Sequence, residues 1–351
     1  MKSLANLLKY ILILILILNA CDKTKDLNSS ENDKYTGISE KPDPFQQNQL
    51  IGRSINLGNA LEAPNEGDWG VTLQAEYFEL IKNAGFNGVR IPIRWSAHAG
   101  DKTPYSIDRT FLSRIDWAIS QAFNNDLAVI LNIHHYNELM DEPEQHKDRF
   151  LAIWEQLSDH YQRYPKELFF EILNEPHNKL TPELWNEYLV QAINGVRELN
   201  PFRTLIIGTA EWGGIGALDK LKFPDDDNLI VTVHYYEPFH FTHQGASWVD
   251  GSNAWLGTQW QSTSNERLEV NSDLDKILVW ATNQNCPVFL GEFGAYNKAD
   301  DQSRYRWTSY VARQAEVREM SWAYWEFCAG FGIYDATTKK WNDLLVKALI
   351  P

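Results

Sequence analysis

Eight short runs rich in β-branched and aromatic residues are the feature that most restricts the fold of this chain. Longer stretches with helical periodicity separate them. Between residues 150 and 164, for example, apolar residues recur at intervals of three and four. A helix on each connection forces neighbouring strands to run parallel. The runs cover residues 54–57, 88–93, 128–133, 168–173, 204–208, 229–234, 287–291 and 321–325.

The spacing of these runs predicts a single (β/α)8 barrel, the TIM-barrel architecture. Most run ends lie 26 to 40 residues apart, near the roughly 31 residues per unit of a 250-residue barrel. The interval between the sixth and seventh ends is 57 residues. It predicts a long loop after the sixth strand, from Tyr235 to about Asn265. Its tryptophans, Trp248, Trp255 and Trp260, either hold a ligand or form a small core of the loop.

The first 44 residues predict export and anchoring. Residues 1–20 have a positive start and an apolar stretch of nine residues, which is too short to cross a hydrocarbon core of ~30 Å. The sequence Leu18-Asn19-Ala20-Cys21 resembles a bacterial lipobox, although Asn19 is atypical. We expect Cys21 to be the lipidated first residue, at the outer membrane or cell surface, with simple secretion as the alternative. Residues 21–44 are polar and read as a flexible tether, and residues 45–351 as one domain.

Composition excludes several classes of function. The net charge is −15, and no block of Lys and Arg provides a surface for nucleic acid. Three cysteines are too few and too scattered for a disulfide framework or a zinc site, so Cys286 and Cys328 are expected to be buried and unpaired. Fourteen Trp and fifteen Tyr suggest a groove for a ligand with flat, partly apolar faces, such as a sugar.

Polar and aromatic clusters follow the predicted strands, where a (β/α)8 barrel builds its site. Two carboxylates matter most, because Glu175 follows the fourth strand and Glu292 the seventh, so both should point into one mouth. Such a pair suits retaining glycoside hydrolysis, in which one carboxylic acid protonates the leaving oxygen and a carboxylate ~5 to 5.5 Å away attacks the anomeric carbon. Ionising one acid disfavours ionising the other, which keeps one protonated.

Six motifs occur in order on the second, third, fourth, sixth, seventh and eighth predicted strands. They are Arg90, His134-His135-Tyr136, Asn174-Glu175-Pro176, His234-Tyr235-Tyr236, Gly291-Glu292-Phe293-Gly294 and Trp322-Ala323-Tyr324-Trp325-Glu326-Phe327. Together they resemble glycoside hydrolase family 5, closest to its endoglucanase and mannanase group from thermophilic bacteria. The resemblance spans the domain from about Ile51 onward.

The resemblance implies roles for these residues. Glu175 is expected to be the general acid and base, and Glu292 the nucleophile. Around them, Asn174 would hold the 2-hydroxyl of the reacting sugar, Arg90 would keep Glu292 ionised, Tyr236 would donate to Glu292, His234 would support Glu175, and Trp325 would lie under the sugar ring. One of His134 and His135 would face the sugar while the other braces the wall. Asn59, Glu62 and Trp248 would line the cleft.

The resemblance also implies a substrate and excludes a cofactor. We expect a monomeric enzyme that cuts β-1,4-glucan internally and acts on mannan or glucomannan as well, with neither a metal ion nor an organic cofactor. Membrane contact is expected only through the lipid anchor. Mannan as the main substrate is one alternative.

Other interpretations remain open at this stage. The protein could be a surface lipoprotein that binds glycans without cleaving them, or a barrel hydrolase that uses a metal ion. A metal pair at His134-His135 is disfavoured, because adjacent strand residues point apart and zinc needs three or more converging ligands. Glu211 and Glu326 are rival carboxylates at strand ends, which we interpret as supporting residues.

Overall fold

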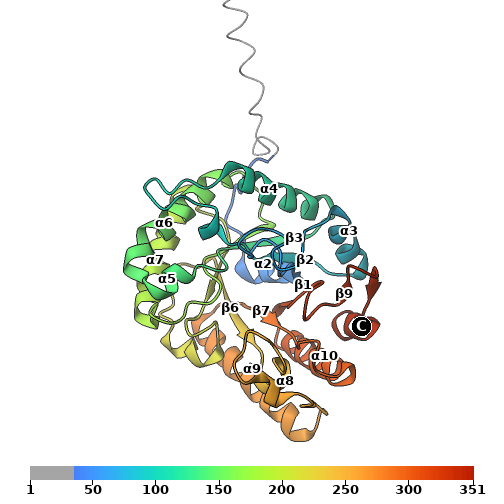
Figure 1. The fold of residues 1–351 in the computed structure, drawn as a ribbon. Helices are drawn as coiled ribbons and strands as arrows, with labels where there is room; N and C mark the ends of the chain where they lie inside the picture. The colour runs from blue at the N-terminus through green and yellow to red at the C-terminus, as the bar shows by residue number, and fades with distance from the viewer. Residues whose placement is uncertain (1–34) are drawn as a thin grey trace, which may run out of the picture.

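The computed structural model describes residues 35–351, so the predicted signal at 1–20, the lipidated Cys21 and the tether up to residue 34 lie outside the described residues. Eight parallel strands close into a barrel in sequential order (Figure 1). This confirms the predicted (β/α)8 barrel, and every predicted run contains a strand whose ends differ by at most two residues. The strands are β1 (Arg53–Asn56), β2 (Gly88–Ile91), β3 (Ala128–Asn132), β4 (Leu168–Glu171), β5 (Leu205–Gly208), β6 (Leu229–Tyr235), β7 (Val288–Phe293) and β8 (Ser321–Tyr324).

Helices surround the barrel and bury one face against it. Their starts follow from the sequence: Thr181 caps α7 ahead of a proline, and Thr263 forms a capping box with Glu266 at the start of α9. Among residues 35–351, none of the helices combines the length and apolarity needed to cross a bilayer. The main helices are α3 (Ala75–Ala84), α4 (Arg109–Asn124), α6 (Pro143–His160), α7 (Pro182–Leu199), α9 (Ser264–Gln284), α10 (Asp301–Val317) and α11 (Asp343–Leu349).

One connection lacks the predicted α-helix. Between β5 and β6 the chain forms only a short 3-10 helix, η4 (Ile215–Lys220). This is also the shortest of the predicted intervals, and it contains the glycines Gly213, Gly214 and Gly216, which disfavour a regular helix. The short connection leaves the loop after β5 close to the mouth of the barrel.

An N-terminal helix closes the opposite end. Helix α2 (Pro44–Ile51) begins with Asp43 as its cap and lies across the start of the strands. Its Asn48 donates to the carbonyl of Val288, at the start of β7, and accepts from Ser321, at the start of β8. Ile51 joins Phe169, Phe289 and other apolar side chains of the strands in a core inside the barrel. The N-terminal end is therefore packed, and the opposite end is free to hold a site.

The loop after β6 is as long as predicted and is partly ordered into short helices. It contains α8 (Phe239–Thr242) and η5 (Ser252–Trp255) before α9 begins at Ser264. Smaller elements elsewhere are η3 (Trp95–Ala97), α5 (Asn137–Asp141) and a two-stranded sheet of β9 (Tyr334–Asp335) and β10 (Lys340–Trp341).

The described end of the predicted tether contacts the barrel. Tyr35 packs against the rings of Phe123 and Tyr164, at centroid distances of 5.9 and 4.7 Å. The backbone N–H of Gly37 donates to the carbonyl of Arg163. Residues 35–43 thus differ from the flexible tether that was predicted up to residue 44. The flexible tether was predicted because this segment has few bulky apolar residues. That prediction gave no weight to the single aromatic ring of Tyr35, which packs against the barrel domain.

Candidate active site

Glu175 and Glu292 meet at the carboxyl end of the barrel. Glu175 lies in the loop after β4, and Glu292 lies within β7, where an irregularity in the pairing with β6 places His234 beside it. An oxygen of each carboxylate and a ring nitrogen of His234 all lie within 4.8 Å of one another. This separation is close to the ~5 to 5.5 Å of a retaining glycosidase and shorter than the ~6.5 to 9.5 Å of an inverting one.

Glu292 is buried among groups that stabilise its charge. Arg90 donates to it from Nη1 at 2.7 Å, and the hydroxyl of Tyr236 donates at 2.9 Å. Burial raises the pKa of Glu292, but the charges of His234 and Arg90 and the hydrogen bonds from Arg90 and Tyr236 outweigh it, so the pKa lies below its usual range. Burial raises the pKa of Tyr236 well above its usual value, so the phenol keeps its proton and donates. The arrangement holds Glu292 as an ionised carboxylate.

Arg90 connects Glu292 to a second buried acid that sequence reasoning missed. Its Nε and Nη2 atoms donate to Glu171 at 2.6 Å each, while Nη2 also donates to Asn174 and Nη1 to Asn56. We call these five residues the floor network. Glu292 and Asn174 line the cavities at the mouth of the barrel, while Asn56, Arg90 and Glu171 are fully buried. Burial lowers the pKa of Arg90, but the charge of Glu171 more than offsets it, and the pKa is raised. The one sequence signal that could have revealed Glu171 was the presence of a carboxylate inside the otherwise apolar run 168–173.

His234 connects the two catalytic carboxylates. Its Nδ1 lies 2.7 Å from Oε1 of Glu175 and 3.7 Å from Oε2 of Glu292. Burial lowers the pKa of His234, but the charges of Glu292 and Glu175 outweigh burial and the pKa is raised. Gly213 packs against this pair with a φ of 68°, and a Cβ there would lie 3.2 Å from the imidazole ring. The contacts predicted for His234 and Tyr236 are therefore present, and the loop after β5 approaches the acid closely enough to require glycine.

A cavity of about 1220 Å³ extends across the mouth of the barrel. Glu175 and Glu292 line it, and Arg90 lies below it in the floor network. Most of the residues predicted to bind substrate line the same cavity, namely Asn59, Glu62, His134, His135, His234, Tyr236, Trp248 and Trp325. Aromatic residues that were not predicted to bind, Phe239, Tyr296 and Phe331, also line it, together with His243.

His134 and His135 both line the cleft, whereas only one was predicted to face the substrate. The prediction assumed strand alternation, but β3 ends at Asn132, so both histidines follow the strand. His134 stacks on Trp325 with a centroid distance of 5.6 Å. Burial lowers the pKa of His134 well below its usual value, and burial with the charge of Arg94 lowers the pKa of His135 to about 4. Both imidazoles are therefore neutral at pH 7.

The metal interpretation has one geometric candidate. Within residues 35–351, the one group of three converging ligands consists of Glu175, His234 and Glu292, the same atoms that form the carboxylate pair. The His134-His135 pair is not part of such a group. Cys286 and Cys328 are free thiols, as predicted. The predicted burial is confirmed for Cys286 and wrong for Cys328, which is partly exposed.

The three tryptophans of the loop after β6 divide between the two predicted roles. Trp248 is 59% exposed and lines the cleft. Trp260 is 1% exposed and packs on Tyr310, so it forms part of the core. Trp255 packs against Phe239 at the rim.

The two other carboxylates at strand ends, Glu211 and Glu326, lie in positions that suit a supporting role. Glu211 lies at the rim of the cleft and forms an ion pair with Lys220. Glu326 is fully buried and accepts backbone N–H groups of Cys328, Ala329 and Phe331.

Glu62 and Glu326 form a second pair of buried acids next to the cleft. Glu62 accepts the backbone N–H groups of Asn59 and Ala60 and so holds the loop after β1. Burial raises the pKa of Glu62 to about 8 and the pKa of Glu326 to about 7. The backbone hydrogen bonds that each carboxylate accepts lower its pKa, but burial outweighs them. Both acids therefore titrate near neutral pH.

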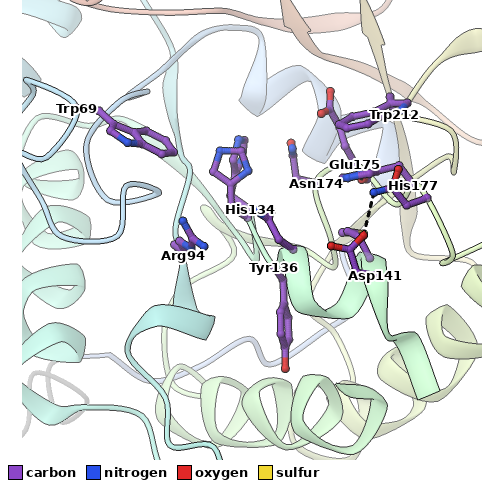
Figure 2. A pocket seen from close by; sticks show the side chains of 13 residues that line it. Trp69, Arg94, His134, Tyr136, Asp141, Asn174, Glu175, His177 and Trp212 are labelled. Carbon is purple, nitrogen blue, oxygen red and sulfur yellow. Dashed lines mark hydrogen bonds between the residues drawn. The ribbon is translucent and has the colours of Figure 1, made fainter. Parts of the chain in front are cut away.

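A smaller cavity of about 330 Å³, the side cavity, opens beside Glu175 (Figure 2). Trp69 and Arg94 lie on one side of it, and Glu175, His177 and Trp212 lie on the other (Figure 2). His177 and Trp212 are stacked with a centroid distance of 3.5 Å. Residues lining it also include His134, His135, Tyr136, Asn137, Met140, Asp141, Asn174 and Asn178.

Comparisons with protein-family models and with curated proteins both find similarity to cellulases. The family model described as Cellulase (glycosyl hydrolase family 5) matches residues 46–330. Endoglucanase H of Acetivibrio thermocellus is 33% identical over 313 residues, which cover 88% of this chain and 33% of that protein. Endoglucanase B of Clostridium cellulovorans is 28% identical, over 82% of this chain and 70% of that protein. The chain thus spans about a third of the length of the first of these relatives.

Some solved structures are more similar in sequence to this chain than these two relatives are. The structure of Thermotoga maritima Cel5A in complex with mannotriose is 55% identical, with a TM-score of 0.87, over 88% of this chain and 100% of that chain. The structure of the same protein in complex with cellobiose gives the same values. The fold is therefore shared with these solved structures.

Proposed function

The chain belongs to the cellulase family, glycosyl hydrolase family 5, and on that premise we propose that it is an endo-acting β-1,4-glucanase that retains the anomeric configuration. One observation carries the mechanism: one carboxylate oxygen of Glu175 and one of Glu292 lie within 4.8 Å of each other in an extended cavity. The names of the similar endoglucanases support glucan as the substrate.

In the first step, a carboxylate oxygen of Glu292 attacks the anomeric carbon. The bond from that carbon to the glycosidic oxygen breaks, and its electron pair passes to the oxygen, which takes the proton of Glu175. Arg90 and Tyr236 hold Glu292 in its ionised form before attack. Asn174, held by Arg90, is placed to bond the 2-hydroxyl of the reacting sugar.

In the second step, water replaces the leaving sugar. Glu175, now a carboxylate, takes a proton from this water, whose oxygen attacks the anomeric carbon and releases Glu292. Because His234 contacts Glu175 directly, it stabilises the carboxylate during this half of the cycle. Two displacements at one carbon give net retention of configuration.

Purified residues 35–351 assayed on carboxymethylcellulose, mixed-linkage glucan, glucomannan, mannan, xylan and xyloglucan test the substrate. We expect internal cleavage of the first two, seen as a rapid fall in viscosity before reducing ends accumulate. Proton NMR of the first product should show the β-anomer. An α-anomer as first product, or no cleavage of any β-1,4-glucan, contradicts the proposal. Activity that survives excess EDTA supports a mechanism through the carboxylates alone, while its loss favours the metal-dependent alternative.

Mannan is the second candidate substrate. Glucose and mannose differ only in the direction of the 2-hydroxyl, so a site that bonds this group through one amide needs little adjustment to accept either. The mannotriose complex of a protein 55% identical to this chain supports this candidate. Comparing kcat/KM on glucomannan and on pure mannan ranks the two sugars.

We further propose that the protein is a monomeric lipoprotein, exported across the inner membrane and anchored through Cys21 at the outer membrane or cell surface. The apolar stretch and the Leu18-Asn19-Ala20-Cys21 sequence support the anchor. Labelled palmitate should be incorporated into the full chain and not into Cys21→Ser, whereas simple secretion leaves both unlabelled. Light scattering of residues 35–351 tests the monomer.

A further inference from the structure

The side cavity contains a cation without a partner. Arg94 is half-buried just after β2, and its backbone is fixed by a hydrogen bond to Leu61. Its Nε atom is buried and, among residues 35–351, has no hydrogen-bond partner. In the same part of the chain no carboxylate forms an ion pair with its guanidinium. A buried N–H of a guanidinium without an acceptor is unfavourable, and a ligand that supplies the acceptor recovers that cost.

Three buried arginines, Arg90, Arg149 and Arg203, have their donors occupied. Arg90 is held by Glu171 and Glu292. Arg203 donates to Asn200 and to four backbone carbonyls, and Arg149 donates to three carbonyls and to Tyr136. Arg313 also has buried nitrogens, Nε and Nη1, without a hydrogen-bond partner among the described residues, but its Nη2 forms an ion pair with Glu316. What distinguishes Arg94 is that it borders a cavity rather than packed backbone.

The walls of the side cavity suit a sugar unit. Trp69 is 40% exposed and Trp212 is 56% exposed, and they lie on opposite sides of it (Figure 2). Apolar rings of this kind pack against the flat faces of a pyranose. Arg94 lies beside Trp69, while Asp141 lies across the cavity, where its carboxylate accepts from Asn178 (Figure 2). A negative group on the ligand is thus favoured on the Trp69 side.

Charge distinguishes the side cavity from the main cleft. Five glutamates line the larger cavity, and among the described residues that line it there is no Lys or Arg. Arg94 is the one Lys or Arg among the described residues that line the side cavity. An anionic group on a polysaccharide is therefore attracted at this position and finds no Lys or Arg along the rest of the cleft.

We propose that the side cavity binds a carboxylate carried by the glycan, such as a uronic acid substituent, and that Arg94 is the residue that selects it. The inference rests on the proposed function, because the carboxylate must belong to a chain that reaches Glu175 and Glu292. A planar carboxylate matches the guanidinium fork and can accept two parallel hydrogen bonds. The enzyme then prefers β-glycans with acidic substituents near the cleavage point over neutral ones.

Carboxymethylcellulose and hydroxyethylcellulose, one anionic and one neutral, test this preference. The measured quantity is the ratio of kcat/KM on the anionic polymer to kcat/KM on the neutral one. Arg94→Gln should lower this ratio about tenfold, mainly through KM on the anionic polymer. Arg94→Lys, which keeps the charge but not the fork, should lower it less. Lys166→Gln removes one exposed positive charge ahead of β4, at the opposite end of the barrel, and should leave the ratio unchanged.

Salt and product analysis add two readouts. Raising the salt concentration should move the ratio of the wild type toward that of Arg94→Gln, because salt screens the attraction that the variant lacks. Mass spectrometry of the products should find carboxymethyl groups enriched at one fixed position from the new chain ends with the wild type only. Circular dichroism checks that each variant is folded, and Arg94→Lys serves if Arg94→Gln is not.

The outcomes separate this inference from the proposed function. A ratio for Arg94→Gln within twofold of the wild type, or equal losses on both polymers, overturns the role of Arg94 and leaves the glucanase proposal standing. A wild type that cleaves neither polymer overturns the proposed function and the inference with it. A lowered ratio in Arg94→Gln, whose difference from the wild-type ratio shrinks as salt is raised, with Lys166→Gln unchanged, supports the inference.

Discussion

Arg90 and Arg94 lie four residues apart in the sequence, yet they belong to regions with opposite properties. Arg90, in the floor network, is fully buried and makes five side-chain hydrogen bonds. Arg94, in the side cavity, is half-buried and its Nε has no partner among the described residues. The floor network fixes charge in advance of the reaction, whereas the side cavity keeps a charge available for a ligand. Changes in the floor network should therefore act on kcat, and changes in the side cavity on KM.

The largest effect is expected at the nucleophile. Glu292→Gln removes the attacking carboxylate while preserving shape, so kcat should fall on the order of 10³-fold or more. Folding and oligosaccharide binding should be largely retained, as measured by circular dichroism and calorimetric titration. Retention of more than a few per cent of the wild-type rate would show that another group attacks.

Loss of the acid should depend on the leaving group. Glu175→Ala should lower the rate on natural glucan by about 10² to 10⁴. Aryl glycosides with good leaving groups need no proton and should keep much of their glycosylation rate, measured as a pre-steady-state burst. Equal losses on both substrate classes contradict the assignment of Glu175.

Glu171→Gln tests whether the floor network tunes the nucleophile. Removing the Glu171 charge unpairs a buried guanidinium and should lower the free energy of unfolding by about 3 kcal/mol or more. With Glu171 neutral, the charge of Arg90 acts on Glu292 alone, so the pKa of Glu292 falls further. The acidic limb of the kcat/KM profile should then move to lower pH, which a merely structural role does not predict. Glu187→Gln, which breaks the exposed pair with Lys147, is the control and should change neither.

Trp69→Ala tests the side cavity as a binding surface. The variant removes one wall of the side cavity and should raise KM on polymeric glucan by about tenfold or less, with kcat nearly unchanged, because one exposed ring supplies only ~1 kcal/mol. A fall in kcat comparable to that of Glu171→Gln would mean that the two regions are not separate in function. Phe45→Ala, an exposed aromatic residue on α2 at the other end of the barrel, is the matched control.

The smallest effect concerns pH and stability. The folded pKa of Glu62 is raised to about 8, above its unfolded value of 4.5, so its contribution to stability is complete below pH 4.5 and is lost as the pH rises through 8. Glu62→Gln should therefore flatten the fall in Tm between pH 5 and pH 8, measured by calorimetry. Glu326, with a pKa raised to about 7, leaves part of that slope in the variant. Glu79→Gln, at an exposed position on α3, should keep the wild-type slope.

The strands and the strand-end residues were accessible from the sequence because their signals are local. Each run of β-branched and aromatic residues marked a strand to within two residues, and the residue types that follow each run identified the cleft. The missing helix after β5 had a local signal in the short interval and its glycines, which the prediction of a helix on every connection overlooked. The placement of both His134 and His135 in the cleft was not accessible, because it depends on where β3 ends, which neighbouring elements decide.

The buried partners were also beyond the sequence. Glu171 lies in a run that looks like any core strand, and only the closed barrel shows that it faces inward, onto Arg90. In the same way, nothing in the sequence near Arg94 distinguishes an unpaired arginine from a paired one. Trp248 and Trp260, twelve residues apart in one loop, differ in exposure from 59% to 1% for reasons of packing.

The order of strands, the closure of the barrel and the two carboxylates at its mouth were thus determined by the sequence itself, since periodicity and chain connectivity act over short distances. The tertiary structure decided which charges are shared and which are left free. Arg90 divides its charge between Glu171 and Glu292 because β2, β4 and β7 converge inside one barrel. Pairing of this kind depends on distances of a few ångströms between segments remote in the chain, and only the folded packing sets those distances.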